Sequence, residues 1–225
     1  MGRMENIMSY KREFIEFLMD ANVLQFGKFI TKSGRETPYF FNAGKIRTGK
    51  QICEMGKFYA AVYNEKIANK NSVLYGPAYK GISIAVSASV ALANEGLDLP
   101  FFFNRKEVKD HGEGGIFVGY QPTQGEEIVI VEDVITAGTA IRESMDILST
   151  IKDSKVTAAI VMVDRMERGQ NEISAIQEIK ETYGFPVYPI ITVLDIIAYL
   201  EETGADPALI ADMHAYLAKY GAKQN

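Results

Sequence analysis

Two adjacent acids followed by small and hydroxyl-bearing residues stand near the middle of this chain. Glu132 and Asp133 follow the β-branched segment 128–131, and residues 136–139, Thr-Ala-Gly-Thr, lead into a helix-like stretch. A strand, a tight loop and a helix start form an anion site, because backbone N–H groups at a helix N-terminus are unpaired and the helix dipole favours negative charge. The carboxylates can accept hydrogen bonds from sugar hydroxyls or hold a hydrated metal. The pattern indicates a ligand with phosphate and hydroxyl groups; the alternative is an ordinary helix cap after two acids.

Polar clusters also follow other predicted strands. Strand-like segments alternate with segments of helical periodicity, which predicts an α/β fold with a mostly parallel sheet flanked by helices. Ligands of such sheets bind beyond the C-terminal ends of the strands. The clusters at 76–81, 105–115, 132–139 and 164–165 should therefore meet at one rim of the sheet.

The expected elements form a single domain, 1–225, with a small N-terminal hood mainly at 1–47 and a core at about 48–225. The hood consists of an amphipathic helix and a hairpin of two short strands joined by a polar turn. In the core, a strand at 100–103 is followed by the charged, glycine-rich stretch 104–115, which we expect to be a loop. The remaining expected strands are 72–75, 127–131, 156–163 and 187–193, and the remaining helices are 48–68, 82–94, 140–148, 173–182, 194–201 and 207–219.

Composition limits the class of protein. A net charge of −5 argues against a general nucleic-acid binder, which needs an excess of Lys and Arg to neutralise phosphates. The single cysteine, Cys53, excludes an internal disulfide and a cysteine-based zinc site. The N-terminus lacks the apolar core of a signal peptide, and no segment is apolar enough to span a membrane. We therefore expect a cytoplasmic enzyme that binds neither nucleic acid nor membrane.

The stretch 128–140 resembles the phosphoribosyl-diphosphate (PRPP) motif of type I phosphoribosyltransferases. It is not a Walker loop, because no Gly-Lys-Ser/Thr follows, and no Gly-x-Gly-x-x-Gly opens the helix. Together with 31–42, 76–81, 104–115 and Leu194-Asp195, it resembles the orotate phosphoribosyltransferases of the bacterial, single-activity type, over nearly the whole chain. The resemblance implies the type I phosphoribosyltransferase fold. It also implies transfer of 5-phosphoribosyl from PRPP to orotate with Mg²⁺, giving orotidine 5′-monophosphate and diphosphate in de novo pyrimidine (UMP) synthesis.

The same resemblance assigns the residues that bind PRPP. Mg²⁺ would be held mainly through PRPP and water, near Glu132 and Asp133. The implied PRPP-binding residues are Lys32, Tyr79, Lys80, Arg105, Lys106, Lys109, His111, Glu132, Asp133, Val134, Ile135, Thr136, Ala137, Gly138, Thr139 and Ala140.

The basic cluster in 105–115 matches the family's mobile catalytic loop. Displacement of diphosphate builds negative charge on the leaving group and positive charge on the sugar ring, so catalysis needs cations and exclusion of water. Arg105, Lys106, Lys109 and His111 are the implied catalytic residues; Lys109 would stabilise the leaving group and His111 would donate a proton. In the family this loop reaches the neighbouring subunit's active site, which implies a homodimer with shared sites. By composition alone, the cluster fits a solvated basic loop equally well.

Orotate is a flat pyrimidine with a carboxylate, which a planar guanidinium can bind through two hydrogen bonds. Arg165 at a predicted strand end suits this role, and Thr136 matches a position that touches both substrates. Phe40 and Phe41 match positions that enclose the base, although core packing accounts for these aromatics equally. Two alternatives remain: a type I transferase for another base, such as a purine, and a non-catalytic relative that senses PRPP.

Overall fold

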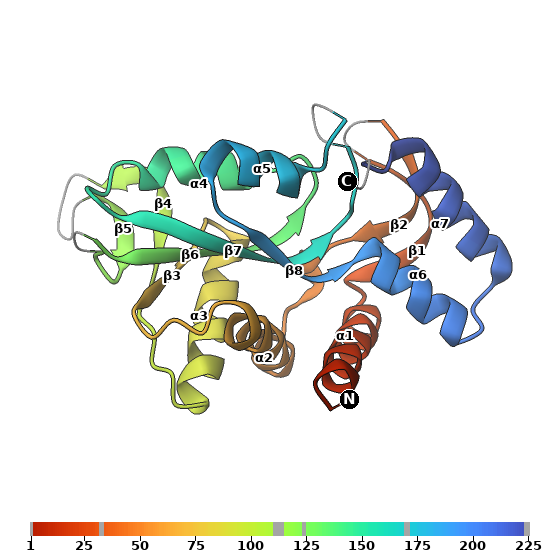
Figure 1. Ribbon diagram of the computed structural model, residues 1–225, viewed down its shortest axis with the longest axis horizontal. Coiled ribbons are helices and arrows are strands. Elements are labelled where there is room, and N and C mark those ends of the chain that lie inside the picture. Colours follow the sequence, from red (N-terminus) through yellow and green to blue (C-terminus); the bar gives the residue numbers. More distant parts are fainter. Residues whose placement is uncertain (1, 32–33, 110–114, 123–124, 169–171, 223–225) are drawn as a thin grey trace.

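The computed structural model describes residues 2–31, 34–109, 115–122, 125–168 and 172–222. A six-stranded sheet in the order β5-β4-β3-β6-β7-β8 forms the centre of the molecule (Figure 1). All neighbouring strands are parallel except β4 and β5, so the predicted mostly parallel α/β sheet is confirmed. The strands are β3 (Ser72–Gly76), β4 (Phe101–Lys109), β5 (Gly115–Gly119), β6 (Glu127–Ile135), β7 (Lys155–Asp164) and β8 (Val187–Thr192).

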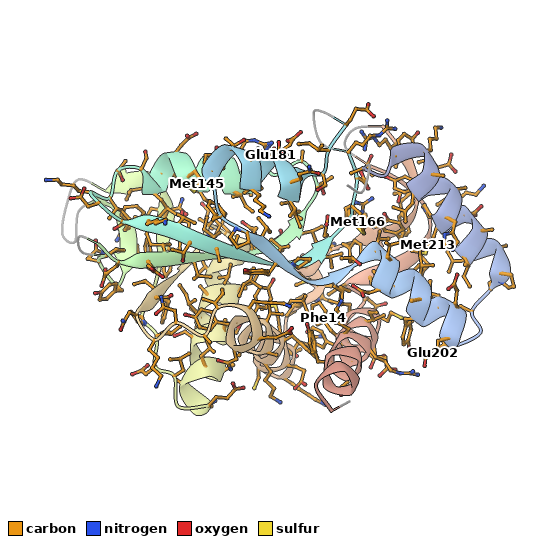
Figure 2. All side chains as sticks on the ribbon, in the orientation of Figure 1. Phe14, Met145, Met166, Glu181, Glu202 and Met213 are labelled. Atoms are coloured by element: carbon orange, nitrogen blue, oxygen red, sulfur yellow. The ribbon has the colours of Figure 1, made fainter. Side chains whose placement is uncertain are left out.

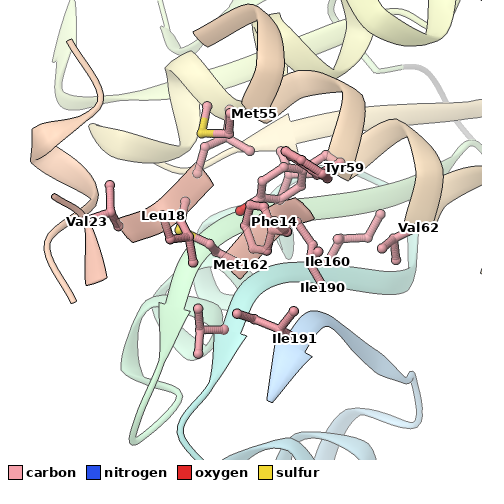
Figure 3. Packing of buried hydrophobic residues seen from close by; sticks show 14 of the residues in the cluster. Phe14, Leu18, Val23, Met55, Tyr59, Val62, Ile160, Met162, Ile190 and Ile191 are labelled. Atoms are coloured by element: carbon pink, nitrogen blue, oxygen red, sulfur yellow. The ribbon is translucent and has the colours of Figure 1, made fainter. Parts of the chain in front are cut away.

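Helices cover both faces of this sheet (Figure 1). α1 (Gly2–Asp20), α2 (Gly49–Lys66) and α3 (Lys80–Asn94) lie on one face, and α4 (Thr139–Leu148) and α5 (Ala175–Tyr183) lie on the other. Because successive side chains of a strand point to opposite faces, Val129 and Val131 of β6 join the first core while Ile128 and Ile130 join the second. Figure 3 shows the first core, where Phe14 and Tyr59 meet Ile160 and Met162.

Helix starts follow local sequence signals. Thr48 and Gln51 form a capping box at α2, and Thr192 and Asp195 form another at α6 (Val193–Glu202). α7 (Pro207–Tyr220) begins with an aspartate cap and a proline in its first turn. None of the described helices has the length and apolar character needed to cross a membrane.

The predicted N-terminal helix and hairpin are present. β1 (Leu24–Ile30) and β2 (Glu36–Phe41) pair antiparallel, and a 3-10 turn (Ala43–Lys45) follows. α1 contributes to the main core through Phe14, while the last helix, α7, packs beside β2, with the rings of Tyr39 and Tyr216 5.6 Å apart. Phe14 of α1 and Met213 of α7, both labelled in Figure 2, are fully buried. The two ends of the chain therefore support the hairpin together.

The prediction of a loop at 104–115 was wrong for the whole of its described part. β4 continues past Phe103 to Lys109, and β5, which was not predicted, returns antiparallel to it, with Asn104 opposite Phe117. The run of charged residues from Arg105 is typical of a loop. An antiparallel hairpin at the edge of a sheet, however, is defined by its backbone ladder, and its side chains can face water.

The contact between α2 and α3 depends on Gly56. A Cβ on Gly56 would lie 2.3 Å from the backbone oxygen of Ser87, so the two helices would have to separate. We expect Gly56→Ala to lower the free energy of unfolding by about 1–3 kcal/mol, measured by urea denaturation. Gly49→Ala in the same helix is the control, since nothing lies within 4 Å of its added Cβ. Equal stability of the two variants would contradict this packing.

Candidate active site

The small-residue loop predicted to bind phosphate joins β6 to α4. β6 runs through both acids to Ile135 because β7 pairs with it as far as Asp164, so its predicted end at the acids was too early. Gly138 caps α4 with a φ of +73°, and an added Cβ would lie 2.8 Å from Nη1 of Arg142. Glycine is therefore required here. No side chain caps the helix, which leaves its first N–H groups available to an anion.

Arg142, which sequence reasoning missed, holds this loop from behind. Its Nη1 donates to the backbone oxygen of Ala137 at 2.6 Å, and its Nη2 donates to the buried carboxylate of Glu178, also at 2.6 Å. The available signal was its position one turn into the helix, where a long basic side chain can reach back to the loop. The loop is thus anchored to α5 by a charged pair.

The loop opens into a cleft of about 700 Å³. Three of the four predicted strand-end clusters contribute to it, through Lys80, the 132–141 segment and Arg165, and β2 of the hairpin adds its end. Thr31 and Asn42 also line the cleft, and sequence reasoning had given them no role. The full lining is Thr31, Phe40, Phe41, Asn42, Lys80, Glu132, Asp133, Val134, Ile135, Thr136, Ala137, Gly138, Thr139, Ala140, Ile141, Val161 and Arg165.

The two acids have different surroundings. Glu132 is buried, and its carboxylate accepts a hydrogen bond from the backbone N–H of Asp133 at 2.9 Å. Burial, and then the neighbouring charge of Asp133, raises the pKa of Glu132 to about 8. Asp133 forms an ion pair with Lys80, with Oδ2 and Nζ 2.6 Å apart. The cleft therefore holds one protonatable acid and one acid that is already paired.

The segment after β3 is held against β4 by Asn104, another residue without a predicted role. Its side-chain oxygen accepts hydrogen bonds from the hydroxyl of Tyr75 at 2.8 Å and from the backbone N–H of Ala78 at 2.9 Å. The next peptide bond, Ala78–Tyr79, is cis. Tyr79 projects outward with 72% of its surface exposed, which places it beside the cleft rather than in its lining.

The predicted catalytic residues that the structure describes lie outside the cleft of their own chain. Arg105 donates through Nη1 to the backbone oxygens of Gly115 and Phe117, both at 3.1 Å. The ammonium of Lys106 lies 5.6 Å from the ring centre of Tyr79. The backbone of Lys109 ends β4, but its side chain, together with Lys32 and His111, lies outside the described part of the chain.

Three of the residues predicted to bind the base, Phe40, Phe41 and Arg165, line the same cleft as the small-residue loop, which holds the fourth, Thr136. Arg165 is buried there, with its guanidinium 4.7 Å from the ring centre of Tyr39. Phe40 is 37% exposed and stacks on Phe29, whereas Phe41 is half-buried and packs on Tyr39. Phe40 therefore presents an open aromatic surface, and Phe41 combines core packing with a place in the cleft wall.

Comparison with known proteins agrees with this arrangement. The family model for the phosphoribosyl transferase domain matches residues 42–189. An orotate phosphoribosyltransferase of Vibrio atlanticus (strain LGP32) is 48% identical, over 95% of this chain and 99% of that protein. The corresponding enzyme of Klebsiella pneumoniae (strain 342) is 50% identical, over 94% and 98%. The chain belongs to the orotate phosphoribosyltransferase family. The crystal structure of a Francisella tularensis member, 36% identical, has a TM-score of 0.83 and covers 93% of this chain and 100% of that one.

The cleft of this family member offers few ligands for a metal held by protein alone. No group of three or more histidine, cysteine or carboxylate side chains gathers within the described ranges. The two acids of β6 are the oxygen donors nearest the loop, and one of them is paired with Lys80. Such a donor set fits a hydrated Mg²⁺ that takes most of its ligands from water and substrate oxygens.

The raised pKa of Glu132 should make stability depend on pH. Between pH 4.5, the ordinary pKa of a glutamate, and about pH 8, Glu132 is protonated in the folded protein and ionised in the unfolded chain. The unfolded chain therefore binds fewer protons, so the free energy of unfolding should fall as pH rises through this range. Burial also raises the pKa of Asp164, to about 6, and this group adds to the same pH dependence. The contribution of Glu132 must therefore be measured by comparing a Glu132 variant with the parent.

We expect the free energy of unfolding of Glu132→Gln to fall less steeply than that of the parent in the upper part of this pH range. The variant should be more stable than the parent at pH 8.5, as measured by urea titrations from pH 5 to 9. Glu127→Gln, at the other end of β6, is the control and should retain the parent's slope. Parallel curves for Glu132→Gln and the parent would show that Glu132 ionises normally.

Proposed function

We propose that this chain transfers the 5-phosphoribosyl group of PRPP to orotate in pyrimidine synthesis. A C–N bond forms between the ribose and the base while the C–O bond to diphosphate and the N–H bond of that ring nitrogen break, so orotidine 5′-monophosphate, diphosphate and a proton are the products. One observation carries the proposal: an uncapped helix start beside two acids shares a single cleft with Arg165 and Phe40. The helix start and the acids thus suit a phosphorylated sugar, and Arg165 with Phe40 suits a flat anionic base.

PRPP would occupy the end formed by β6 and α4. The N–H groups and hydroxyls of the segment 136–140 would bind its 5′-phosphate, and Glu132 and Asp133 would accept hydrogen bonds from the ribose hydroxyls. Tyr79 and Lys80 would contact the diphosphate, together with Lys32, which lies outside the described residues. Asp133 and Lys80 already form an ion pair, with Oδ2 and Nζ 2.6 Å apart. When PRPP binds, Lys80 would contact the diphosphate and Asp133 would contact the ribose.

Orotate would lie between the hairpin and the end of β7. The guanidinium of Arg165 would bind its carboxylate, Phe40 and Phe41 would enclose the ring, and Thr136 would contact both substrates. The buried position of Arg165 strengthens this interaction, since a charge–charge contact away from water is less screened. A neutral base would leave the guanidinium without this partner, which favours orotate over purines and uracil.

Leaving-group stabilisation would come from a second subunit. The chain from β4 to β5, residues 101–119, is here called the β4–β5 arm; it contains Arg105, Lys106, Lys109 and His111. The described part of this arm does not line the cleft of its own chain. This placement supports a homodimer in which each arm reaches the partner's cleft. The cations of the arm would neutralise the departing diphosphate, and the arm would exclude water from the charged ribose.

Mg²⁺ would bind at the PRPP end. It would be held mainly through PRPP and water, with Glu132 and Asp133 as the protein residues near it. The ion would supply charge neutralisation for the leaving group; the protein residues orient the ribose and hold the base.

The direct test is the loss of orotate absorbance when protein, PRPP and Mg²⁺ are mixed, with adenine, hypoxanthine and uracil run in parallel. The proposal expects rapid, Mg²⁺-dependent loss with orotate alone. Turnover of another base but not orotate would support a different type I transferase. PRPP binding without turnover of any base would support a sensor.

Lys109→Ala should lower kcat by a factor of about 10² to 10³ while the fold is retained, because the lost charge acts on the transition state. Steady-state kinetics and circular dichroism would measure the two effects. Lys155→Ala, an exposed lysine at the start of β7, is the control and should keep the parental kcat. Unchanged turnover in Lys109→Ala would remove this lysine from the mechanism.

Mixing Lys109→Ala with Asp133→Asn should restore activity if sites are shared. In a hybrid dimer one cleft combines an intact Asp133 with an intact arm from its partner, so about a quarter to a half of the parental rate per hybrid is expected from one working site of two. Differently tagged subunits would allow the hybrids to be isolated and assayed. Purified hybrids without activity would show that each site is built from one chain.

A further inference from the structure

A buried carboxylate stands behind Arg165. The side chain of Glu167 is 2% exposed, and its Oε1 lies 2.7 Å from both Nε and Nη2 of Arg165. Its Oε2 accepts a hydrogen bond from Nη1 of Arg35 at 3.0 Å. One carboxylate thus lies between two guanidinium groups, one from the end of β7 and one from the residue before β2.

The C-terminal helix completes the cluster. The hydroxyl of Tyr216, on α7, donates to Oε1 of Glu167 at 2.8 Å and lies 3.5 Å from Nη2 of Arg165. The hydroxyl of Thr37, on β2, lies 3.5 Å from the same nitrogen. Three segments far apart in the sequence therefore fix one guanidinium, and each contact is shielded from solvent.

This arrangement leaves a defined part of Arg165 for a ligand. Within the described chain, the hydrogen bonds of its guanidinium run from Nε and Nη2, and Nη1 is the remaining nitrogen of a residue that lines the cleft. Two guanidinium groups and one carboxylate also leave a net charge of +1. A single ligand carboxylate would neutralise the cluster.

We propose that Glu167 is a positioning residue that sets the orientation of Arg165 for a carboxylate-bearing base, with Tyr216 and Arg35 as its supports. The inference rests on the proposed function, because it takes Arg165 as the residue that contacts the orotate carboxylate. Glu167 acts through geometry as well as charge. An Arg165 without this anchor would be a buried cation without its carboxylate, held only by the two 3.5 Å contacts of Nη2 and able to rotate away from the cleft.

The test compares KM for orotate with KM for PRPP. We expect Glu167→Gln to raise the orotate KM about tenfold or more, and Tyr216→Phe to raise it about threefold to tenfold, each leaving the PRPP KM within about twofold. Glu167→Asp keeps the charge but shortens the side chain, so a positioning role expects its orotate KM to rise as well. Tyr63→Phe is the matched control, a tyrosine that donates to the oxygen of Asn69 near the start of β3, and both KM values should be unchanged.

The outcomes separate this inference from the function on which it rests. Parent protein that does not turn over orotate, or Arg165→Lys with an unchanged orotate KM, would overturn the proposed base site itself. A raised orotate KM in Arg165→Lys with parental values in Glu167→Asp and Tyr216→Phe would overturn only the positioning role. Equal rises in both KM values would indicate a general loss of structure and also overturn it. If Glu167→Gln does not fold, Tyr216→Phe decides.

Discussion

The cleft exists because β6 pairs in parallel with β3 on one side and with β7 on the other. Parallel strands place their C-terminal ends at one edge of a sheet, so the segments that follow these three strands meet there. From β3 the chain continues to β4 on one side, and from β6 it continues to β7 on the other. The two connections diverge, and a crevice opens between them. Lys80 and Asp133 face each other across it at 2.6 Å.

Paired charges maintain the shape of this crevice. Arg142 with Glu178 holds the small-residue loop, and Arg165 with Glu167 holds the end of β7 against the hairpin and α7. Burial makes an unpaired charge costly, so removing one partner of such a pair is strongly destabilising. Glu132 lies beside Asp133 without a cation of its own in the described structure, and its carboxyl keeps its proton to higher pH. The cleft walls are therefore held by paired charges, and Glu132 in its lining has a raised pKa.

Several features of the fold could be read directly from the sequence. The β-branched run 128–131 predicted a strand buried on both faces, and Val129 and Ile130 pack into different cores. Small residues after two acids predicted a strand–loop–helix turn, which Gly138 makes with its left-handed backbone. The segment from Arg105 to Lys109 was misread because charged residues are typical of loops, and its strand structure depends on pairing with β5, which was not predicted.

The sequence by itself determined most of the strands and helices, the strand–loop–helix turn that carries the two acids, and the family, because these depend on neighbouring residues and short-range periodicity. Only the tertiary structure decided which distant residues meet. Glu167 with Arg35 and Tyr216, Asn104 with the segment after β3, and Arg142 with Glu178 are separated by up to 132 residues along the chain. Such contacts carry no local pattern. They form because folding removes these polar groups from water, and each must then find its partner among the segments that the sheet brings together.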